Sequence, residues 1–219
     1  MGALTRAQLD EVYVSVLTYY TEQVLRHGAT PLGVDWSDAR TQELRFAQLL
    51  TLCDFTAGFE LNDVGCGYGA LCSYLARCHP STEIDYLGID LSPAMIREAG
   101  RGAGHLRKTR FAVGNASPRV ADYSIASGIF NVKLDASPRR WEQFVAYTLA
   151  GLRASSKRGF AVNFKTRNRD NHRAPAGLYV TSPKAWIRFC EQQFGWTAEP
   201  LQGYGLDEFT LLVRSPGVS

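Results

Sequence analysis

The stretch that decides the fold is Leu61-Asn62-Asp63-Val64-Gly65-Cys66-Gly67-Tyr68-Gly69. It joins a short apolar strand to a turn of three glycines, and a second apolar strand ends at Asp90, 21 residues after Gly69. Glycines let the backbone turn sharply and approach a ligand with which a Cβ would collide. A carboxylate at the tip of the next strand can accept hydrogen bonds from both hydroxyls of a ribose. The pattern therefore predicts a doubly wound α/β sheet that binds an adenosine-containing cofactor.

The spacing of this turn distinguishes between the possible cofactors. NAD, FAD and S-adenosylmethionine all use related glycine turns. Here the spacing is G-x-G-x-G, and Asp63 precedes the first glycine by two positions. A carboxylate is unfavourable beside a pyrophosphate, but it suits a ligand whose amino group and sulfonium are both cationic. The residues favour S-adenosylmethionine, and the alternative is a tight strand-to-helix turn without a ligand.

Four segments resemble the motifs of one enzyme family. Residues 63–69 and 87–95 resemble motifs I and II of the class I S-adenosylmethionine-dependent methyltransferases, and residues 111–116 and 123–130 resemble motifs III and IV. The resemblance covers about residues 40–215. It implies a Rossmann-like, mostly parallel seven-stranded sheet that ends in an antiparallel hairpin. It also implies an enzyme that uses S-adenosylmethionine and releases S-adenosylhomocysteine.

The resemblance also implies which residues contact the cofactor. They are Asp63, Gly65, Cys66, Gly67 and Gly69 around the methionine part, Asp90 on the ribose, Leu91 and Met95 beside the adenine, Asn115 and Ala116 at the adenine amine and ring edge, and Ser127 in motif IV. Family members often have Asp at the position of Asn115. An Asn carbonyl can still accept a hydrogen bond from the amine, so this departure changes the assignment little.

The N-terminal region concentrates aromatic and hydrogen-bonding residues ahead of the first strand. We expect residues 1–40 to form a helical lid and residues 41–219 to form the methyltransferase domain. Tyr20 and Trp36 would then wall the site, and Arg45 would pair with the cofactor carboxylate through its planar guanidinium. The alternative is that the aromatic residues only pack this helix pair on the sheet. The region also resembles a small bacterial subgroup of the family found in biosynthetic and polysaccharide gene clusters.

Hydrophobic periodicity predicts the remaining elements. Helices are expected over residues 5–27, 41–55, 69–78, 93–99, 139–153 and 183–194, and strands over residues 61–64, 84–89, 110–113, 123–129, 159–165, 197–201 and 207–214. Strands that alternate with helices imply right-handed crossovers and a mainly parallel sheet.

Composition agrees with a single globular domain. The chain has 219 residues, of which 45% are hydrophobic and 21% are charged, and its net charge is +3. No apolar run approaches the ~20 residues of a membrane span, and the N-terminus lacks the layout of a signal peptide. We therefore expect a soluble, cytoplasmic monomer or homodimer without membrane partners. The five cysteines are odd in number and lack C-x-x-C spacing, so we expect buried thiols and no bound metal.

Residues that act on the methyl acceptor are harder to identify, because the acceptor itself supplies the nucleophile. Motif IV lacks the Asn-Pro-Pro-Tyr sequence that grips a flat amino group, and no acidic pair marks a metal-assisted enzyme. Candidates for a catalytic role are His27, Asn131 and His172, and candidates for substrate binding are Lys133, Arg167, Arg169, Tyr179 and Tyr204. Each also has an ordinary structural role as its alternative.

The segment 165–173 carries four Lys or Arg residues against one acid and follows the fifth strand. Such a segment favours an anionic substrate, and the alternative is a solvated loop. We expect methyl transfer to O or N of a small, anionic or polar metabolite of a natural-product or sugar pathway. The rival enzyme is an RNA methyltransferase, which the small net charge disfavours. The non-enzyme rival is a cofactor-binding regulatory subunit.

Overall fold

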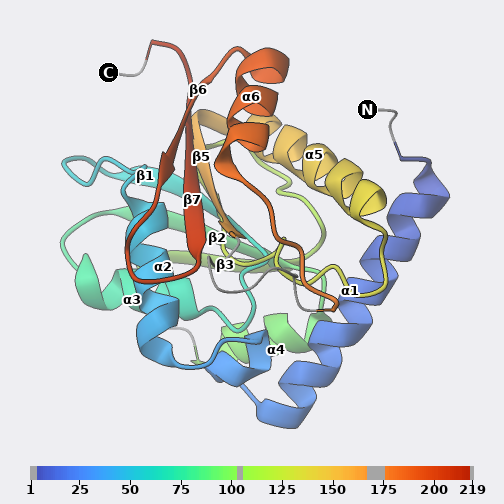
Figure 1. Ribbon diagram of the computed structural model, residues 1–219. Helices are drawn as coiled ribbons and strands as arrows, with labels where there is room; N and C mark the ends of the chain where they lie inside the picture. The colour runs from blue at the N-terminus through green and yellow to red at the C-terminus, as the bar shows by residue number, and fades with distance from the viewer. Residues whose placement is uncertain (1–3, 103–105, 167–175, 218–219) are drawn as a thin grey trace.

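The computed structural model describes residues 4–102, 106–166 and 176–217. Its centre is a seven-stranded sheet in the order β3-β2-β1-β4-β5-β7-β6 (Figure 1). The strands are β1 (Phe59–Val64), β2 (Ile84–Asp90), β3 (Lys108–Val113), β4 (Ala121–Ala126), β5 (Ser156–Lys165), β6 (Thr197–Leu201) and β7 (Glu208–Arg214). The first five strands pair in parallel, and β7 is antiparallel to both of its neighbours. This confirms the predicted fold class, including the hairpin that ends the sheet.

Helices cover both faces of the sheet. They are α1 (Arg6–His27), α2 (Ala39–Leu50), α3 (Ala70–Cys78), α4 (Pro93–Gly102), α5 (Pro138–Ala154) and α6 (Pro183–Phe194), with a short 3₁₀ helix η1 (Pro31–Val34) after α1. None of the described helices combines the length and the hydrophobicity that crossing a bilayer requires.

Side chains of β5 show how the sheet separates two hydrophobic clusters. Phe160, Val162 and Phe164 pack with residues of α5 and α6, whereas Ala161 packs with residues of α2 and α3. Successive residues of a strand point to opposite faces, and a parallel strand buried on both faces carries apolar residues at each position. The continuous apolar run of β5 is thus a consequence of its central place in the sheet.

Helix α1 lies across the carboxyl ends of the parallel strands (Figure 1). It begins at a capping box, in which the Thr5 hydroxyl accepts from the backbone amide of Gln8 and the Gln8 side chain accepts from the amide of Thr5. Tyr13 meets Phe144 of α5 edge to face, and Val24 packs on Ala94 and Met95 of α4. The N-terminal segment therefore bridges helices on either side of the pocket described below.

Two element boundaries differ clearly from the expectations. The helix predicted over residues 41–55 begins earlier, because the Asp38 carboxylate caps the amide of Thr41, and it ends at Leu50. The strand predicted over residues 123–129 ends at Ala126. Beyond it the chain turns at Gly128, whose φ is +77° and whose amide donates to Asn163 Oδ1 at 2.7 Å.

Candidate functional site

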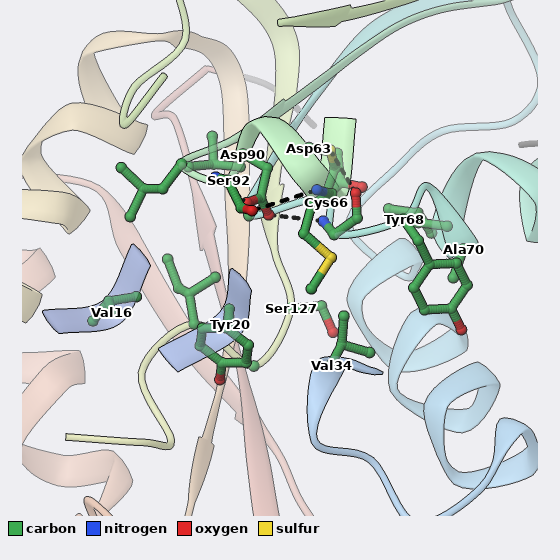
Figure 2. A pocket seen from close by; sticks show the side chains of 18 of the residues that line it. Val16, Tyr20, Val34, Asp63, Cys66, Tyr68, Ala70, Asp90, Ser92 and Ser127 are labelled. Atoms are coloured by element: carbon green, nitrogen blue, oxygen red, sulfur yellow. Dashed lines mark hydrogen bonds between the residues drawn. The ribbon is translucent and has the colours of Figure 1, made fainter. Parts of the chain in front are cut away.

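A pocket opens at the carboxyl ends of β1, β2 and β4, beneath α1 (Figure 2). Its empty volume is about 1000 Å³, open solvent at the mouth included. Asp90 and Ser92 lie on one side of it, Tyr68 and Ala70 lie on the other, and Asp63 lies between them (Figure 2). Clefts at the strand ends of open α/β sheets are where such folds bind their ligands.

Asp90 connects the glycine turn to the end of β2. Its Oδ2 accepts from the amide of Gly67 at 2.9 Å, and its Oδ1 accepts from the amide of Ser92 at 2.8 Å. Burial raises the pKa of this carboxyl to about 6, although both amide hydrogen bonds oppose the shift. Each carboxylate oxygen has a second lone pair, so both remain able to accept from a ligand hydroxyl.

Asp63 is a buried acid, and one of its two carboxylate oxygens has no hydrogen-bond partner among the described residues. The Tyr86 hydroxyl donates to its Oδ2 at 2.5 Å, and Oδ1 has no partner among the described residues. Burial raises the pKa of Asp63 to about 7. The Ser127 hydroxyl, at the end of the neighbouring strand, is also buried without a partner in the described part of the chain. Buried polar atoms are nearly always paired, so these two fit a ligand that brings N–H donors, as the ammonium of S-adenosylmethionine would.

The N-terminal segment closes over this pocket. Tyr20 of α1, Val34 of η1 and Trp36 contribute to the lining, and the Thr21 and Ser92 hydroxyls are 2.8 Å apart. Gly67 has a φ of +54°, and a Cβ at this position would lie 2.8 Å from Val34 Cγ1. A side chain at Gly67 would therefore collide with the N-terminal segment that covers the glycine turn.

Arg45 departs from its expected role as the partner of the cofactor carboxylate. Its Nε and Nη2 donate to the two oxygens of Glu208 at 2.8 Å each, and Nη1 donates to the carbonyl of Thr41. The guanidinium also stacks 3.8 Å from the Trp36 ring, and Arg45 is not among the residues that line the pocket. Contrary to the expectation, the ion pair with β7 satisfies this buried charge, and the guanidinium lies outside the described pocket lining.

Most of the other predicted cofactor residues are brought together. Gly65, Cys66, Gly67, Leu91, Met95 and Asn115 line the pocket with Asp63, Asp90 and Ser127. Gly69 and Ala116 lie outside the lining, and Gly69 instead serves as the N-cap residue of α3.

The candidates for catalysis and substrate binding are not gathered at the pocket. His27 is the exposed last residue of α1, and the backbone amide of Lys165 donates to the buried Asn131 Oδ1. Lys133 Nζ donates to the carbonyls of Leu134 and Ala136, Tyr179 is buried in the core, and the Tyr204 hydroxyl is 3.2 Å from that of Thr210. The structure thus separates Asn131, Lys133, Tyr179 and Tyr204 from the pocket lining. Arg167, Arg169 and His172 lie outside the described residues.

Gln42 and Ser92 are among the polar residues of the lining that the sequence analysis did not identify. Gln42 lies on α2 with its side chain buried, and it receives a hydrogen bond from the Tyr68 hydroxyl at 2.9 Å. The available signal was its spacing four residues before the buried Phe46, which places a polar group on the apolar face of the helix. Ser92 follows Asp90 by two positions and precedes Pro93, a common sequence at the start of a helix.

Comparisons with known proteins agree with this geometry. Residues 62–151 match the family model described as a methyltransferase domain. The chain is also 41% identical over 157 residues to Rv1506c of Mycobacterium tuberculosis, which bears the provisional name of a methyltransferase. That match covers 71% of this chain and 93% of the relative.

Solved structures with a similar fold include two enzymes bound to the cofactor or its product. Human N-acetylserotonin methyltransferase in complex with S-adenosylmethionine has a TM-score of 0.63 at 16% identity, over 94% of this chain and 59% of that one. The chain thus spans less than two thirds of the length of that enzyme. Magnesium protoporphyrin IX methyltransferase from Synechocystis with bound S-adenosylhomocysteine has a TM-score of 0.54 at 14% identity, over 98% of this chain and 90% of that one. At such identities the likeness concerns the fold.

Proposed function

The chain belongs to the class I S-adenosylmethionine-dependent methyltransferases, and on that premise we propose that it methylates O or N of a small polar metabolite. The observation that carries the proposal is the cover over the pocket. Residues 1–40 would act as a lid, because Tyr20 of α1, Val34 of η1 and Trp36 line the pocket from the N-terminal segment. A pocket covered in this way would admit a metabolite more readily than a folded RNA.

The names of the structural neighbours point the same way. One acts on N-acetylserotonin and the other on magnesium protoporphyrin IX, which are both small molecules. The resemblance of the N-terminal region to enzymes of biosynthetic and polysaccharide gene clusters supports an acceptor from a natural-product or sugar pathway.

Different residues of the pocket would bind the ribose, the adenine and the methionine part of the cofactor. Asp90 would accept from the ribose hydroxyls, and Leu91, Met95 and Asn115, which line the same pocket, would flank the adenine. Asp63 Oδ1 and Ser127 Oγ would accept from the methionine ammonium, which supplies the N–H donors that these atoms lack. When bound, S-adenosylmethionine supplies a methyl carbon made electrophilic by its sulfonium.

The chain contributes to transfer by alignment and exclusion of water. In the transfer that this arrangement would support, a lone pair on the acceptor O or N would bond to the methyl carbon, and the electron pair of the broken carbon–sulfur bond would stay on sulfur. The residues of the lid hold the acceptor in line with that bond and keep water out. The proton lost by the acceptor would pass to solvent or to a base, for which His172, outside the described residues, remains a candidate.

An anionic acceptor is the narrower form of the proposal. The charged side chains of the described lining, Asp63 and Asp90, are both acidic and would not attract an anion. The proposal of an anionic acceptor therefore rests on the Lys and Arg residues of the segment 165–173. Once the acceptor is known, Arg167→Ala and Arg169→Ala should raise its KM and leave cofactor affinity unchanged. An unchanged KM in both variants would contradict the binding of an anionic acceptor by Arg167 and Arg169.

Two rivals remain and one experiment separates them. The protein is incubated with S-adenosylmethionine labelled in its methyl group, together with either a small-molecule extract or total RNA of the organism that encodes it. We expect label in the small-molecule fraction, whereas label in RNA would support the RNA methyltransferase. Transfer to neither, with cofactor still bound, would support the regulatory subunit.

A further inference from the structure

The pocket needs a partner for the carboxylate of the cofactor, because Arg45 is engaged elsewhere. In the amino-acid part of S-adenosylmethionine the ammonium and the carboxylate share one carbon atom. Groups that bind the carboxylate must therefore lie next to Asp63, whose free Oδ1 fits the ammonium. Figure 2 places Asp63 between Asp90 on one side of the pocket and Tyr68 and Ala70 on the other, so the Tyr68 end is the one away from Asp90.

Hydrogen-bond donors line that end of the pocket, and none of the described lining residues is a Lys or an Arg. Gln42 is 5% exposed and lines the pocket. The Tyr68 hydroxyl donates to its Oε1, which fixes the orientation of the amide and leaves the Nε2 group as the end available to a ligand. Burial raises the pKa of Tyr68, so the hydroxyl stays protonated and keeps this arrangement.

The N-terminus of α3 lies at the same end. Gly69 is its N-cap residue, no side chain caps the helix, and Ala70 and Leu71 of its first turn line the pocket. The amides of a first helical turn carry a partial positive charge and stabilise an anion placed near them. Gln42 and the first turn of α3 thus line the same pocket.

Given the function proposed above, we infer that Gln42, oriented by Tyr68, and the first turn of α3 bind the cofactor carboxylate. The subsite recognises an amino-acid carboxylate through neutral donors, and the cation of Arg45 serves the ion pair with β7 instead. Gln42 is accordingly a determinant of specificity for a ligand that carries a carboxylate.

A pair of ligands tests this assignment without knowledge of the acceptor. S-adenosylmethionine and decarboxylated S-adenosylmethionine both carry the sulfonium and the ammonium, and they differ in the carboxylate. Their dissociation constants are measured by calorimetry for the wild type and for Gln42→Glu. We expect the substitution to weaken binding of S-adenosylmethionine by about ten- to a hundredfold, the value of one charge-assisted hydrogen bond. Affinity for the decarboxylated ligand should change by less than about threefold or increase, because the new charge faces a ligand without an anion.

Controls separate the subsite from general damage to the pocket. Gln42→Met removes the donor at similar size without a new charge, and it should also weaken only the ligand with a carboxylate. Gln48→Glu adds the same charge elsewhere on α2 and should affect neither ligand, while Asp90→Ala should weaken both ligands alike. Equal weakening of both ligands by the Gln42 variants, or no weakening, would overturn the inference. Failure of the wild type to bind S-adenosylmethionine would instead overturn the proposed function.

Discussion

At the scale of single residues, the pocket is defined by two acids with different partners, the buried Asp63 and the half-buried Asp90. Asp90 is held by two backbone amides, whereas Asp63 has one hydroxyl partner and one free oxygen. Burial raises the pKa values of both, to about 6 and about 7. A buried carboxylate without enough partners is costly, so Asp63, with its free Oδ1, gains most from a cationic ligand.

Binding of the cofactor should therefore depend on pH through Asp63. Because its pKa is raised above that of an exposed carboxyl, the folded protein keeps a proton there up to about pH 7, and the ammonium favours the ionised form. Affinity for S-adenosylhomocysteine should rise about fourfold between pH 6.5 and pH 8, where Asp90 is already mostly ionised. Calorimetry at several pH values measures this change. The slope should disappear in Asp63→Asn, and a slope that survives this substitution would assign the proton to another group.

Sequence reasoning was strongest for residues whose role is local. The three glycines, Asp63 and Asp90 belong to a turn and the two strands beside it, and their spacing along the chain fixes how they meet. Arg45 could not be placed in this way, because its partner Glu208 is 163 positions away and nothing in the spacing pairs them. The sequence analysis paired the Arg45 guanidinium with the cofactor carboxylate, whereas in the folded chain it pairs with Glu208.

At the scale of elements, the Arg45–Glu208 pair ties α2 to β7 and supports the wall of the pocket. Asn163 of β5 donates to Glu208 and accepts from the amide of Gly128, so the network reaches the loop after β4. A Cβ at Gly128 would lie 2.3 Å from the Trp36 ring, which itself stacks on Arg45. The ion pair, the loop and the indole are thus packed as one unit.

Breaking this pair should destabilise the fold strongly. Glu208→Ala leaves the guanidinium buried without its anion, and we expect the free energy of unfolding to fall by about 3–5 kcal/mol. Arg77 and Glu43 form a matched exposed pair at 2.6 Å, also involving α2, and Arg77→Ala should cost less than about 1 kcal/mol. Urea unfolding measures both variants. Similar losses of unfolding free energy in Glu208→Ala and Arg77→Ala would mean that the buried Arg45–Glu208 pair matters no more for stability than the exposed pair.

Element boundaries show where local pattern stops being sufficient. The strands and most helices follow from apolar periodicity, and α6 has the bounds expected of it. The early end of β4 depends on Asn163 of another strand, which takes up the amide of Gly128. Apolar periodicity along β4 does not predict this contact with β5.

At the scale of the whole molecule, α1 joins α4 and α5 across the pocket, so ligand binding and the order of the N-terminal segment should be linked. Saturation with S-adenosylhomocysteine at about 100 times its Kd should stabilise the protein by ~2.7 kcal/mol. For a chain of this size, that corresponds to a rise in Tm of about 5–10 °C. Hydrogen exchange should slow in α1 as well as in the glycine turn. Protection confined to the turn would contradict the role of residues 1–40 as a lid.

The central claim is that the pocket binds S-adenosylmethionine and its product in preference to a dinucleotide. Calorimetric titration of the wild-type protein with S-adenosylhomocysteine and with NADH tests it most directly. The account predicts one equivalent of S-adenosylhomocysteine bound per chain and much weaker or undetectable binding of NADH, because Asp63 faces the ligand where a pyrophosphate would lie. Tighter binding of NADH than of S-adenosylhomocysteine would contradict it.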